Sequence, residues 1–244
     1  NEWIVELEKM FKQKTIPLAA HHSPFTFLPT YDIDEAYSFK HKLWWRSAGA
    51  AIKDLLMGRF GRFRQRRRVL NNREPDPFDS YAWIDDLHRP YTTEPRYFFL
   101  VAERTGKYDR NILPSETALQ TLIRQHAEKY KVAVHPSWQS GDDPSLIRKE
   151  RETIETITKK KVIASRQHFI RFNLPETFRH LLDAGIQEDF SMGYGSINGF
   201  RASVASPFYW YDLEKEQATS LLLYPYCYME ANSFFEQRST PQQA

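Results

Sequence analysis

Short apolar runs alternate along this chain with segments in which apolar residues recur at helical spacing. The apolar runs, bounded by turn-forming or charged residues, are typical of buried strands. We expect strands at residues 26–31, 97–103, 131–138, 162–169, 190–193, 202–210 and 221–226. Apolar positions three and four residues apart indicate amphipathic helices between them. We expect these helices at 42–57, 115–130, 144–158 and 175–184.

This alternation of strands and helices indicates parallel βα units. A barrel and an open, doubly wound sheet both have that order. No Gly-rich phosphate loop follows the first strand, which argues against binding of a dinucleotide or a nucleoside triphosphate. We favour a single α/β barrel, because reactive side chains fall at the carboxyl ends of several strands. In a barrel those ends converge on one face.

Composition narrows the class of protein. A chain of 244 residues with 15% aromatic residues and only 9 glycines suits a packed globular enzyme. The net charge of +3 is too small to indicate a nucleic-acid partner by itself, and the single cysteine, Cys227, excludes an intrachain disulfide. No apolar run is long enough to span a membrane. Because the chain begins at Asn1 rather than Met, we expect it to be part of a longer protein.

Three segments stand apart from the expected barrel, which spans residues 24–236. Residues 1–23 are expected to form a helix and a connector, as the end of an upstream domain, and 237–244 to form a flexible tail. Residues 58–80 are expected to be an insertion loop, in which seven Arg and two Phe lie between Gly58 and Arg73. Solvation is the ordinary explanation of such a run. Alternatively, the segment contacts an anionic polysaccharide or the phosphates of a nucleic acid. We rank the nucleic acid last.

The most informative segment is Thr30-Tyr31-Asp32-Ile33-Asp34, at the end of the first expected strand. Two Asp two positions apart on a strand point to the same side of the sheet. Two ionised carboxylates so close together repel each other unless a cation lies between them or one of them is protonated. The segment therefore predicts a metal site with an adjacent general base. The alternative is that Asp34 caps a helix beginning near Glu35.

Two histidines and an arginine extend this pattern. His135 follows an apolar run and precedes Pro136, and Arg166 and His168 fall on one side of the fourth expected strand. Taken alone, His135 could satisfy a backbone carbonyl, and Arg166 could form a structural salt bridge. One Asp with two His gives an oxygen and nitrogen ligand set that suits Zn²⁺, with Co²⁺, Ni²⁺ or Fe²⁺ as alternatives. The other Asp is then the natural base, and Arg166 would orient it.

In their order along the chain, these segments resemble the motifs of the polysaccharide deacetylase (NodB-homology) superfamily, in a divergent bacterial branch. The resemblance covers the chain from Thr30 to about Glu230. It implies a distorted (β/α)7 barrel, similar to a TIM barrel, that holds a divalent metal and hydrolyses N- or O-acetyl groups on sugars. It also implies that Asp32 is the base and Asp34 a metal ligand, although the first motif here has one residue inserted relative to Thr-Phe-Asp-Asp.

The other motifs of the superfamily match in part. His135 fits the first histidine of the second motif, whereas Gln139 stands where the second histidine is expected. The resemblance implies that His168 supplies the missing ligand. In the fourth motif an acidic residue orients the arginine, and Asp189 takes that place here. The fifth motif ends in a histidine that acts as general acid, and this chain has Tyr224 instead.

The sequence therefore predicts a metal-dependent hydrolase that removes an acyl group from a carbohydrate amide or ester. Residues expected to contact the sugar are Tyr31, Trp138, Tyr194 and Tyr224. The substrate could be an anionic surface polysaccharide, which would also suit the Arg-rich segment. The departures at Gln139 and Tyr224 support an alternative: a degenerate, non-catalytic barrel that binds glycan or supports a partner domain. The compartment, bacterial cytoplasm or cell envelope, and the oligomeric state are left open.

Overall fold

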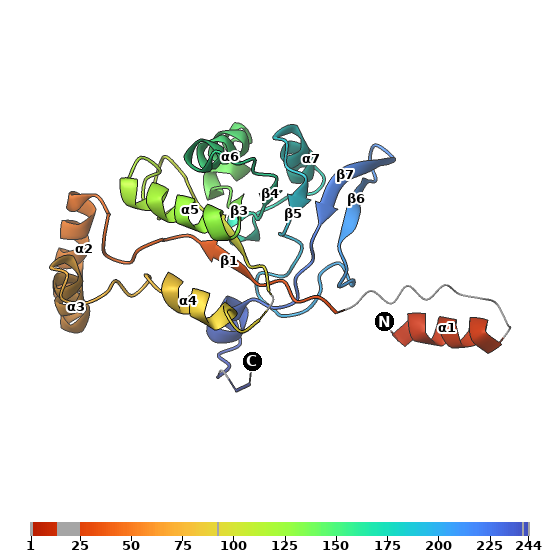
Figure 1. The fold of residues 1–244 in the computed structure, drawn as a ribbon, viewed down its shortest axis with the longest axis horizontal. Helices are drawn as coiled ribbons and strands as arrows, with labels where there is room; N and C mark the ends of the chain where they lie inside the picture. Colours follow the sequence, from red (N-terminus) through yellow and green to blue (C-terminus); the bar gives the residue numbers. More distant parts are fainter. Residues whose placement is uncertain (1, 14–24, 92, 241, 244) are drawn as a thin grey trace.

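The computed structural model describes residues 2–13, 25–91, 93–240 and 242–243 and contains one seven-stranded sheet (Figure 1). Neighbouring strands follow the order β1-β2-β3-β4-β5-β7-β6. The bounds are β1 Thr30–Ile33, β2 Arg96–Phe99, β3 Lys131–Val134, β4 Ala164–Ser165, β5 Glu188–Asp189, β6 Phe208–Asp212 and β7 Gln217–Leu223. The expected mixed α/β fold with a mostly parallel sheet is therefore confirmed.

Helices precede the sheet, connect its strands and follow it. The α-helices are α1 Glu2–Gln13, α2 Trp44–Leu56, α3 Phe60–Leu70, α4 Tyr81–His88, α5 Thr117–Lys129, α6 Ser145–Thr158 and α7 Glu176–Asp183. Three shorter helical segments are η1 Trp138–Gly141, η2 His168–Ile170 and η3 Asn232–Glu236. The helices expected at 42–57, 115–130, 144–158 and 175–184 match α2, α5, α6 and α7, so helical spacing predicted them well.

The main core lies between the sheet and helices α5, α6 and α7, which lie along one side of it (Figure 1). Fully buried Phe99 of β2 and Val134 of β3 pack in the same cluster as Ile123 of α5, Ile154 of α6 and Phe178 of α7. Alternate strand residues point to the other face of the sheet. There a second, smaller cluster contains Phe98, Ala133, Ala164 and Phe190. Strands β2 and β3 thus carry apolar residues on both faces, as is usual in parallel sheets.

A closed barrel is not confirmed. β1 through β5 and β7 are paired in parallel, but β6 forms an antiparallel hairpin with β7. The last two strands are therefore not a βα unit, which corrects the expectation of parallel units throughout. Because β6 occupies one edge and β1 the other, the described residues show no pairing that closes the sheet. The strands are also shorter than expected: the fourth covers Ala164–Ser165 rather than 162–169.

The Arg-rich segment is a helix, not the insertion loop expected at 58–80. Helix α3 covers Phe60–Leu70 and packs against α2. Arginine has a high helix propensity, and residues 59–74 contain no proline. The buried contacts that hold the pair together include Arg66, which donates to Asp54 of α2 at 3.0 Å. Charge composition alone could not show that one arginine of the run has a buried partner.

At the amino end, α1 confirms the expected helix, whereas the connector falls at residues 14–24, outside the described residues. The first helix after β1 is α2, which starts at Trp44, so no helix begins near Glu35. The interpretation of Asp34 as a helix cap is therefore wrong. Within the described ranges, none of the helices is both long and apolar enough to cross a bilayer.

Candidate metal centre

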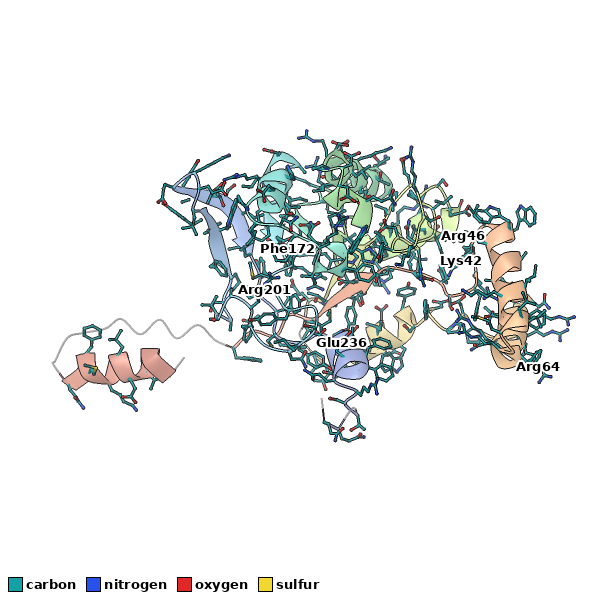
Figure 2. The ribbon with its side chains drawn as sticks, turned by 180° about the vertical axis from the view of Figure 1, so that it is seen from behind. Lys42, Arg46, Arg64, Phe172, Arg201 and Glu236 are labelled. Atoms are coloured by element: carbon teal, nitrogen blue, oxygen red, sulfur yellow. The ribbon has the colours of Figure 1, made fainter. Side chains whose placement is uncertain are left out.

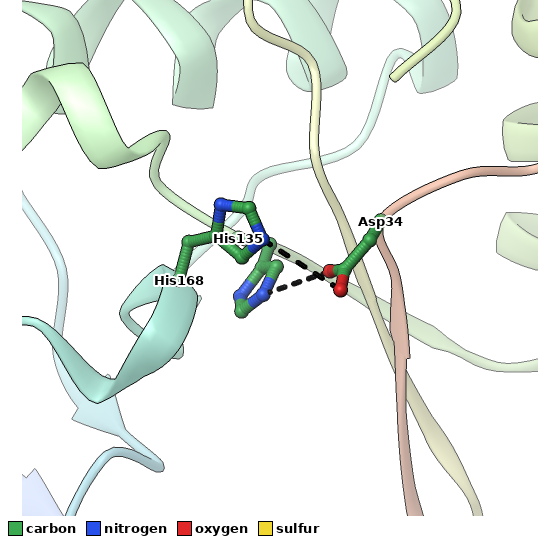
Figure 3. Close-up of side chains that lie close together, drawn as sticks. All are labelled: Asp34, His135 and His168. Atoms are coloured by element: carbon green, nitrogen blue, oxygen red, sulfur yellow. Dashed lines mark ion pairs between the residues drawn. The ribbon is translucent and has the colours of Figure 1, made fainter. Parts of the chain in front are cut away.

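Asp34, His135 and His168 converge at the carboxyl ends of the strands (Figure 3). Each offers one ligand atom, and these atoms lie within 4.8 Å of one another. His135 Nε2 is 3.1 Å from Asp34 Oδ1, and His168 Nε2 is 3.6 Å from Asp34 Oδ2. Both imidazoles are almost completely buried, whereas about half of the Asp34 side chain is exposed (51%). The cluster is therefore open to solvent on the carboxylate side.

Strand order explains why residues so distant in sequence meet. Asp34 directly follows β1, His135 directly follows β3, and His168 begins η2 just after β4. The parallel ladder continues past the strand ends, because the His135 amide donates to the Phe99 carbonyl at 3.0 Å and the His168 amide to the Pro136 carbonyl at 3.3 Å. The parallel strands thus bring three loops together at the carboxyl ends of the strands.

The second nitrogen of each imidazole is held by a hydrogen bond. His135 Nδ1 lies 2.6 Å from the Arg166 carbonyl, which can only accept, so Nδ1 carries the proton. His168 Nδ1 lies 3.1 Å from Asp109 Oδ1, and we assign it the same tautomer. In the neutral imidazoles both Nε2 atoms are then free to act as ligands, the arrangement that is usual around protein-bound zinc. The donor set therefore fits a divalent metal such as Zn²⁺.

Asp109 is a site residue that the sequence did not reveal. This buried carboxylate accepts from His168, from the Trp138 amide at 2.8 Å and from Gln139 Nε2 at 3.0 Å. Burial would raise the pKa of Asp109, but these hydrogen bonds lower it. Gln139, which stands where the superfamily has its second histidine, thus supports the partner of His168 rather than the metal itself. Asp109 lies in the loop between β2 and α5, where Lys107 and Arg110 make it look like an ordinary solvated residue.

Mutual interaction also shifts the pKa values of the candidate ligands. Burial would raise the pKa of Asp34, but the hydrogen bonds and charge of His135 and His168 hold it well below its usual range. Burial would lower the pKa of His168, but the Asp109 and Asp34 carboxylates raise it to about 9. In the absence of a metal, a proton on His168 compensates the negative charge of the two carboxylates. A divalent cation at this position would replace that proton.

Beside the cluster, Asp32 and Arg166 form the expected ion pair. Arg166 donates from one terminal nitrogen to Asp32 Oδ1 at 2.9 Å and from the other to Thr30 Oγ1 at 2.8 Å. Its Nε donates to the Phe190 carbonyl at 3.0 Å, and its guanidinium lies over the Phe98 ring. The other oxygen of Asp32 remains 4.0 Å from His135 Nε2. Arg166 thus fixes one carboxylate oxygen and leaves the second facing the cluster.

Asp189, expected to orient Arg166, makes its hydrogen bonds elsewhere. It is completely buried and accepts from Ser165 Oγ at 2.8 Å, from the Ser191 amide at 2.9 Å and from Ser191 Oγ at 3.0 Å. Burial raises the pKa of Asp189 to about 6, and Arg166 acts on it only as a nearby charge. Asp189 therefore joins the end of β4 to the start of the loop after β5, next to Phe190, whose carbonyl accepts from Arg166.

Two of the residues expected to contact substrate do not contact the cluster. Tyr31 lies on the helix-facing side of the sheet, where its hydroxyl is 2.6 Å from His88 Nε2 and its ring stacks on Tyr97. Tyr224 stacks on Phe190 with ring centroids 4.4 Å apart. Burial raises the pKa of both phenols, which makes each a poorer acid. These contacts therefore give no support to the expectation that Tyr31 or Tyr224 contacts the sugar.

Trp138, a third expected substrate residue, lies in an aromatic group beside the candidate metal centre. Its ring stacks on Tyr108, with centroids 4.2 Å apart, and meets the edge of Phe169. Phe169 is 59% exposed and packs on the ring of His168 at 4.4 Å. It also has a positive φ of 56°, a backbone conformation that is rare for a bulky residue and is found preferentially at functional sites.

Tyr194, the fourth expected substrate residue, is partly exposed in the loop after β5. Its carbonyl accepts from the hydroxyl of Tyr226 at 3.2 Å. Sequence reasoning missed Tyr226, whose ring lies against Arg166 and leaves no space for a side chain at Gly193. Burial raises the pKa of Tyr226 to about 12, although Arg166 lowers it.

Comparison with known proteins gives a distant structural likeness. No protein-family model matches the chain, and none of the curated proteins matches it. A solved structure described as a "putative polysaccharide deacetylase from Mycobacterium smegmatis" is similar, with 13% identity and a TM-score of 0.42. The similarity covers 77% of this chain and 57% of that one, so the chain spans little more than half of that protein. At this TM-score the likeness supports no conclusion about activity.

The role of Asp109 can be tested by replacing its carboxylate with an amide. We expect Asp109→Asn to raise the Kd for Zn²⁺ by about 10-fold to 100-fold, because His168 loses the anionic acceptor that fixes its tautomer. Competition with a chromophoric chelator measures this Kd. Asp142→Asn is the matched control, since Asp142 is 70% exposed and pairs with Arg171. An unchanged Kd in Asp109→Asn would show that Asp109 does not support a ligand.

Glu150 of α6 gives a prediction that does not depend on a metal. Its buried carboxylate accepts from the amide of Ser137 in the loop after His135, and burial raises its pKa from 4.5 to about 7. The folded protein therefore keeps a proton that the unfolded chain loses. The free energy of unfolding should fall as the pH rises from 4.5 to about 7, by an amount on the order of 3 kcal/mol.

Glu150→Gln keeps the hydrogen-bond acceptor but not the titration, so we expect it to remove this fall. Urea unfolding at several pH values measures the effect. Glu152→Gln, at an exposed position on the same helix, should retain the wild-type pH dependence. If Glu150→Gln and the wild type show the same dependence, Glu150 is not protonated in the folded state as described.

Proposed function

We propose that this chain is a metal-dependent hydrolase that removes an acyl group, such as acetyl, from a carbohydrate amide or ester. One observation carries the proposal. The free Nε2 atoms of His135 and His168 converge on Asp34, while the Asp32 carboxylate, oriented by Arg166, faces the same space. This is the set of groups that metal-assisted hydrolysis needs: three ligands and a separate base. The resemblance of the sequence to polysaccharide deacetylases supports the same reaction.

Asp34, His135 and His168 would hold the metal, and Zn²⁺ suits this ligand set best, ahead of Co²⁺, Ni²⁺ and Fe²⁺. When bound, a divalent cation would polarise the acyl carbonyl and make a water molecule more acidic. Asp32 has the role of general base, because one of its oxygens is held by Arg166 and the other is free to take a proton from the attacking water. Arg166 keeps that free oxygen turned toward the cluster.

Departure of the amine or alcohol requires a proton, and the chain offers no histidine at the place of Tyr224. Tyr31 and Tyr224 lack contacts with the cluster and have raised pKa values. Asp32 can instead return the proton that it took from water, so one carboxyl group acts first as base and then as acid. This assignment makes Asp32 responsible for both proton transfers.

The exposed aromatic rings beside His168 support a carbohydrate as the substrate. Tyr108 and Phe169 present exposed rings close to the candidate metal centre, with Trp138 packed against both, and such rings stack on the apolar faces of sugars. A distorted barrel is part of the same proposal, because β1 to β5 follow one another in the sheet in sequence order, with the antiparallel β6–β7 hairpin in place of the last βα units. An anionic polysaccharide remains a candidate within this substrate class.

Asp32→Asn tests the mechanism. We expect it to lower the rate of acetate release from acetylated amino-sugar oligosaccharides by at least about 100-fold, since the amide cannot act as a base. Bound Zn²⁺ should stay at the wild-type level, because Asp32 is not a ligand in this proposal.

Asp86→Asn serves as the control and should retain activity, since Asp86 is 62% exposed on α4 and pairs with Arg89. Unchanged acetate release in Asp32→Asn would refute the proposed base. A wild-type protein that binds Zn²⁺ and glycan but releases no acetate from any acetylated sugar would favour the non-catalytic alternative.

A further inference from the structure

Helices α2 and α3 form a pair that projects from the rest of the molecule. Figure 1 shows the pair at the edge of the structure, away from the sheet. Residues 44–73 carry nine Lys and Arg but only one acidic residue, Asp54. Since the whole chain has a net charge of +3, the remainder is net negative. The positive charge is thus concentrated on this pair.

Helix α2 exposes its apolar side. The residues Trp44, Trp45, Ile52, Leu55 and Leu56, which we call the apolar stripe, recur at helical spacing and are all exposed. Trp44 and Leu56, at the two ends, are 81% and 84% exposed. The side that faces α3 instead holds Asp54, buried in its ion pair with Arg66. An amphipathic helix usually buries its apolar side, so this orientation leaves an apolar surface without a partner among the described residues.

Unpaired cations lie on and just before α3, the helix that packs against α2. Arg59, Arg64 and Arg67 are exposed and make no ion pair within the described part of the chain, whereas Arg62, Arg66 and Arg68 have acidic partners. Arg46 lies with its guanidinium 5.9 Å from the ring centre of Trp45. Figure 2 labels Arg46 and Arg64 on this pair of helices. The surface therefore combines exposed tryptophan and leucine with free positive charge.

We propose that the α2–α3 pair docks on an anionic lipid surface, with the apolar stripe inserted at the level of the headgroups and Arg59, Arg64 and Arg67 against the phosphates. Helices that lie on a membrane have an apolar side with Trp or Leu and a polar side rich in Arg or Lys. Tryptophan favours the membrane interface, and anionic lipids attract clustered cations. This inference is independent of the proposed hydrolase activity.

Two other occupants fit the surface less well. A nucleic acid would account for the arginines but would leave Ile52, Leu55 and Leu56 in water, since aliphatic side chains do not stack on bases as aromatic rings do. A second copy of the chain would cover the apolar stripe but would bring two arginine-rich helix pairs together, and like charges repel. A lipid surface satisfies both features at once.

Sedimentation with vesicles tests the proposal. We expect the wild type to bind vesicles that contain about 30% anionic lipid and not to bind neutral vesicles. Replacing Trp44, Trp45 and Leu56 with Ala, or Arg59, Arg64 and Arg67 with Ala, should each weaken binding at least about 10-fold. The controls are Leu213→Ala, at a site 76% exposed on the β6–β7 turn, and the triple replacement of Arg124, Lys161 and Lys215 with Ala. Both should bind like the wild type.

Several outcomes would overturn the proposal. Equal binding to neutral and anionic vesicles, or wild-type binding by the apolar-stripe variant, would refute it. Salt-sensitive DNA binding that is lost only in the arginine variant would favour a nucleic acid. A wild-type dimer that the apolar-stripe variant converts to a monomer would favour a second copy. If a variant fails to fold, the wild type alone can test insertion. The measurement is quenching of its tryptophan fluorescence by lipids brominated in the acyl chain. Quenching is expected, and its absence on anionic vesicles would refute insertion.

Discussion

The parallel pairing of β1, β2, β3 and β4 is the constraint on which the candidate metal centre depends. It places the loops after β1, β3 and β4 together at the carboxyl ends of the strands. Asp34, His135 and His168 each lie in one of those loops. None of the three is close to another in sequence, so no local structure could bring them together. A slip of one residue in any of these strands would turn its side chains to the opposite face.

Hydrogen bonds then convert proximity into a defined ligand set. The Arg166 carbonyl fixes one imidazole and Asp109 fixes the other. Arg166 has two functions, because its carbonyl orients His135 while its guanidinium orients Asp32. The candidate ligands and the candidate base are therefore coupled through a single residue. This coupling explains why Arg166 is nearly buried although it is charged.

Sequence patterns predicted the fold and the centre of the site better than they predicted its surroundings. Helical spacing located α2, α5, α6 and α7 because their buried sides repeat regularly. Asp34 and His135 were found because they follow apolar runs, whereas His168 was found through its place on the fourth expected strand and the resemblance to polysaccharide deacetylases. Asp109 was not found, because a carboxylate among charged residues in a loop looks the same whether it supports a histidine or faces water. The exposed side of α2 was also beyond prediction, since amphipathic spacing says which residues share a side but not which side is buried.

The central claim is that Asp34, His135 and His168 bind one divalent cation, and metal content after exposure to Zn²⁺ and desalting tests it most directly. Plasma mass spectrometry on protein prepared without a His tag should find about one equivalent of Zn²⁺ per wild-type chain. It should find almost none in folded Asp34→Ala, His135→Ala or His168→Ala. A folded wild type without metal, or variants that retain the full equivalent, would contradict the account.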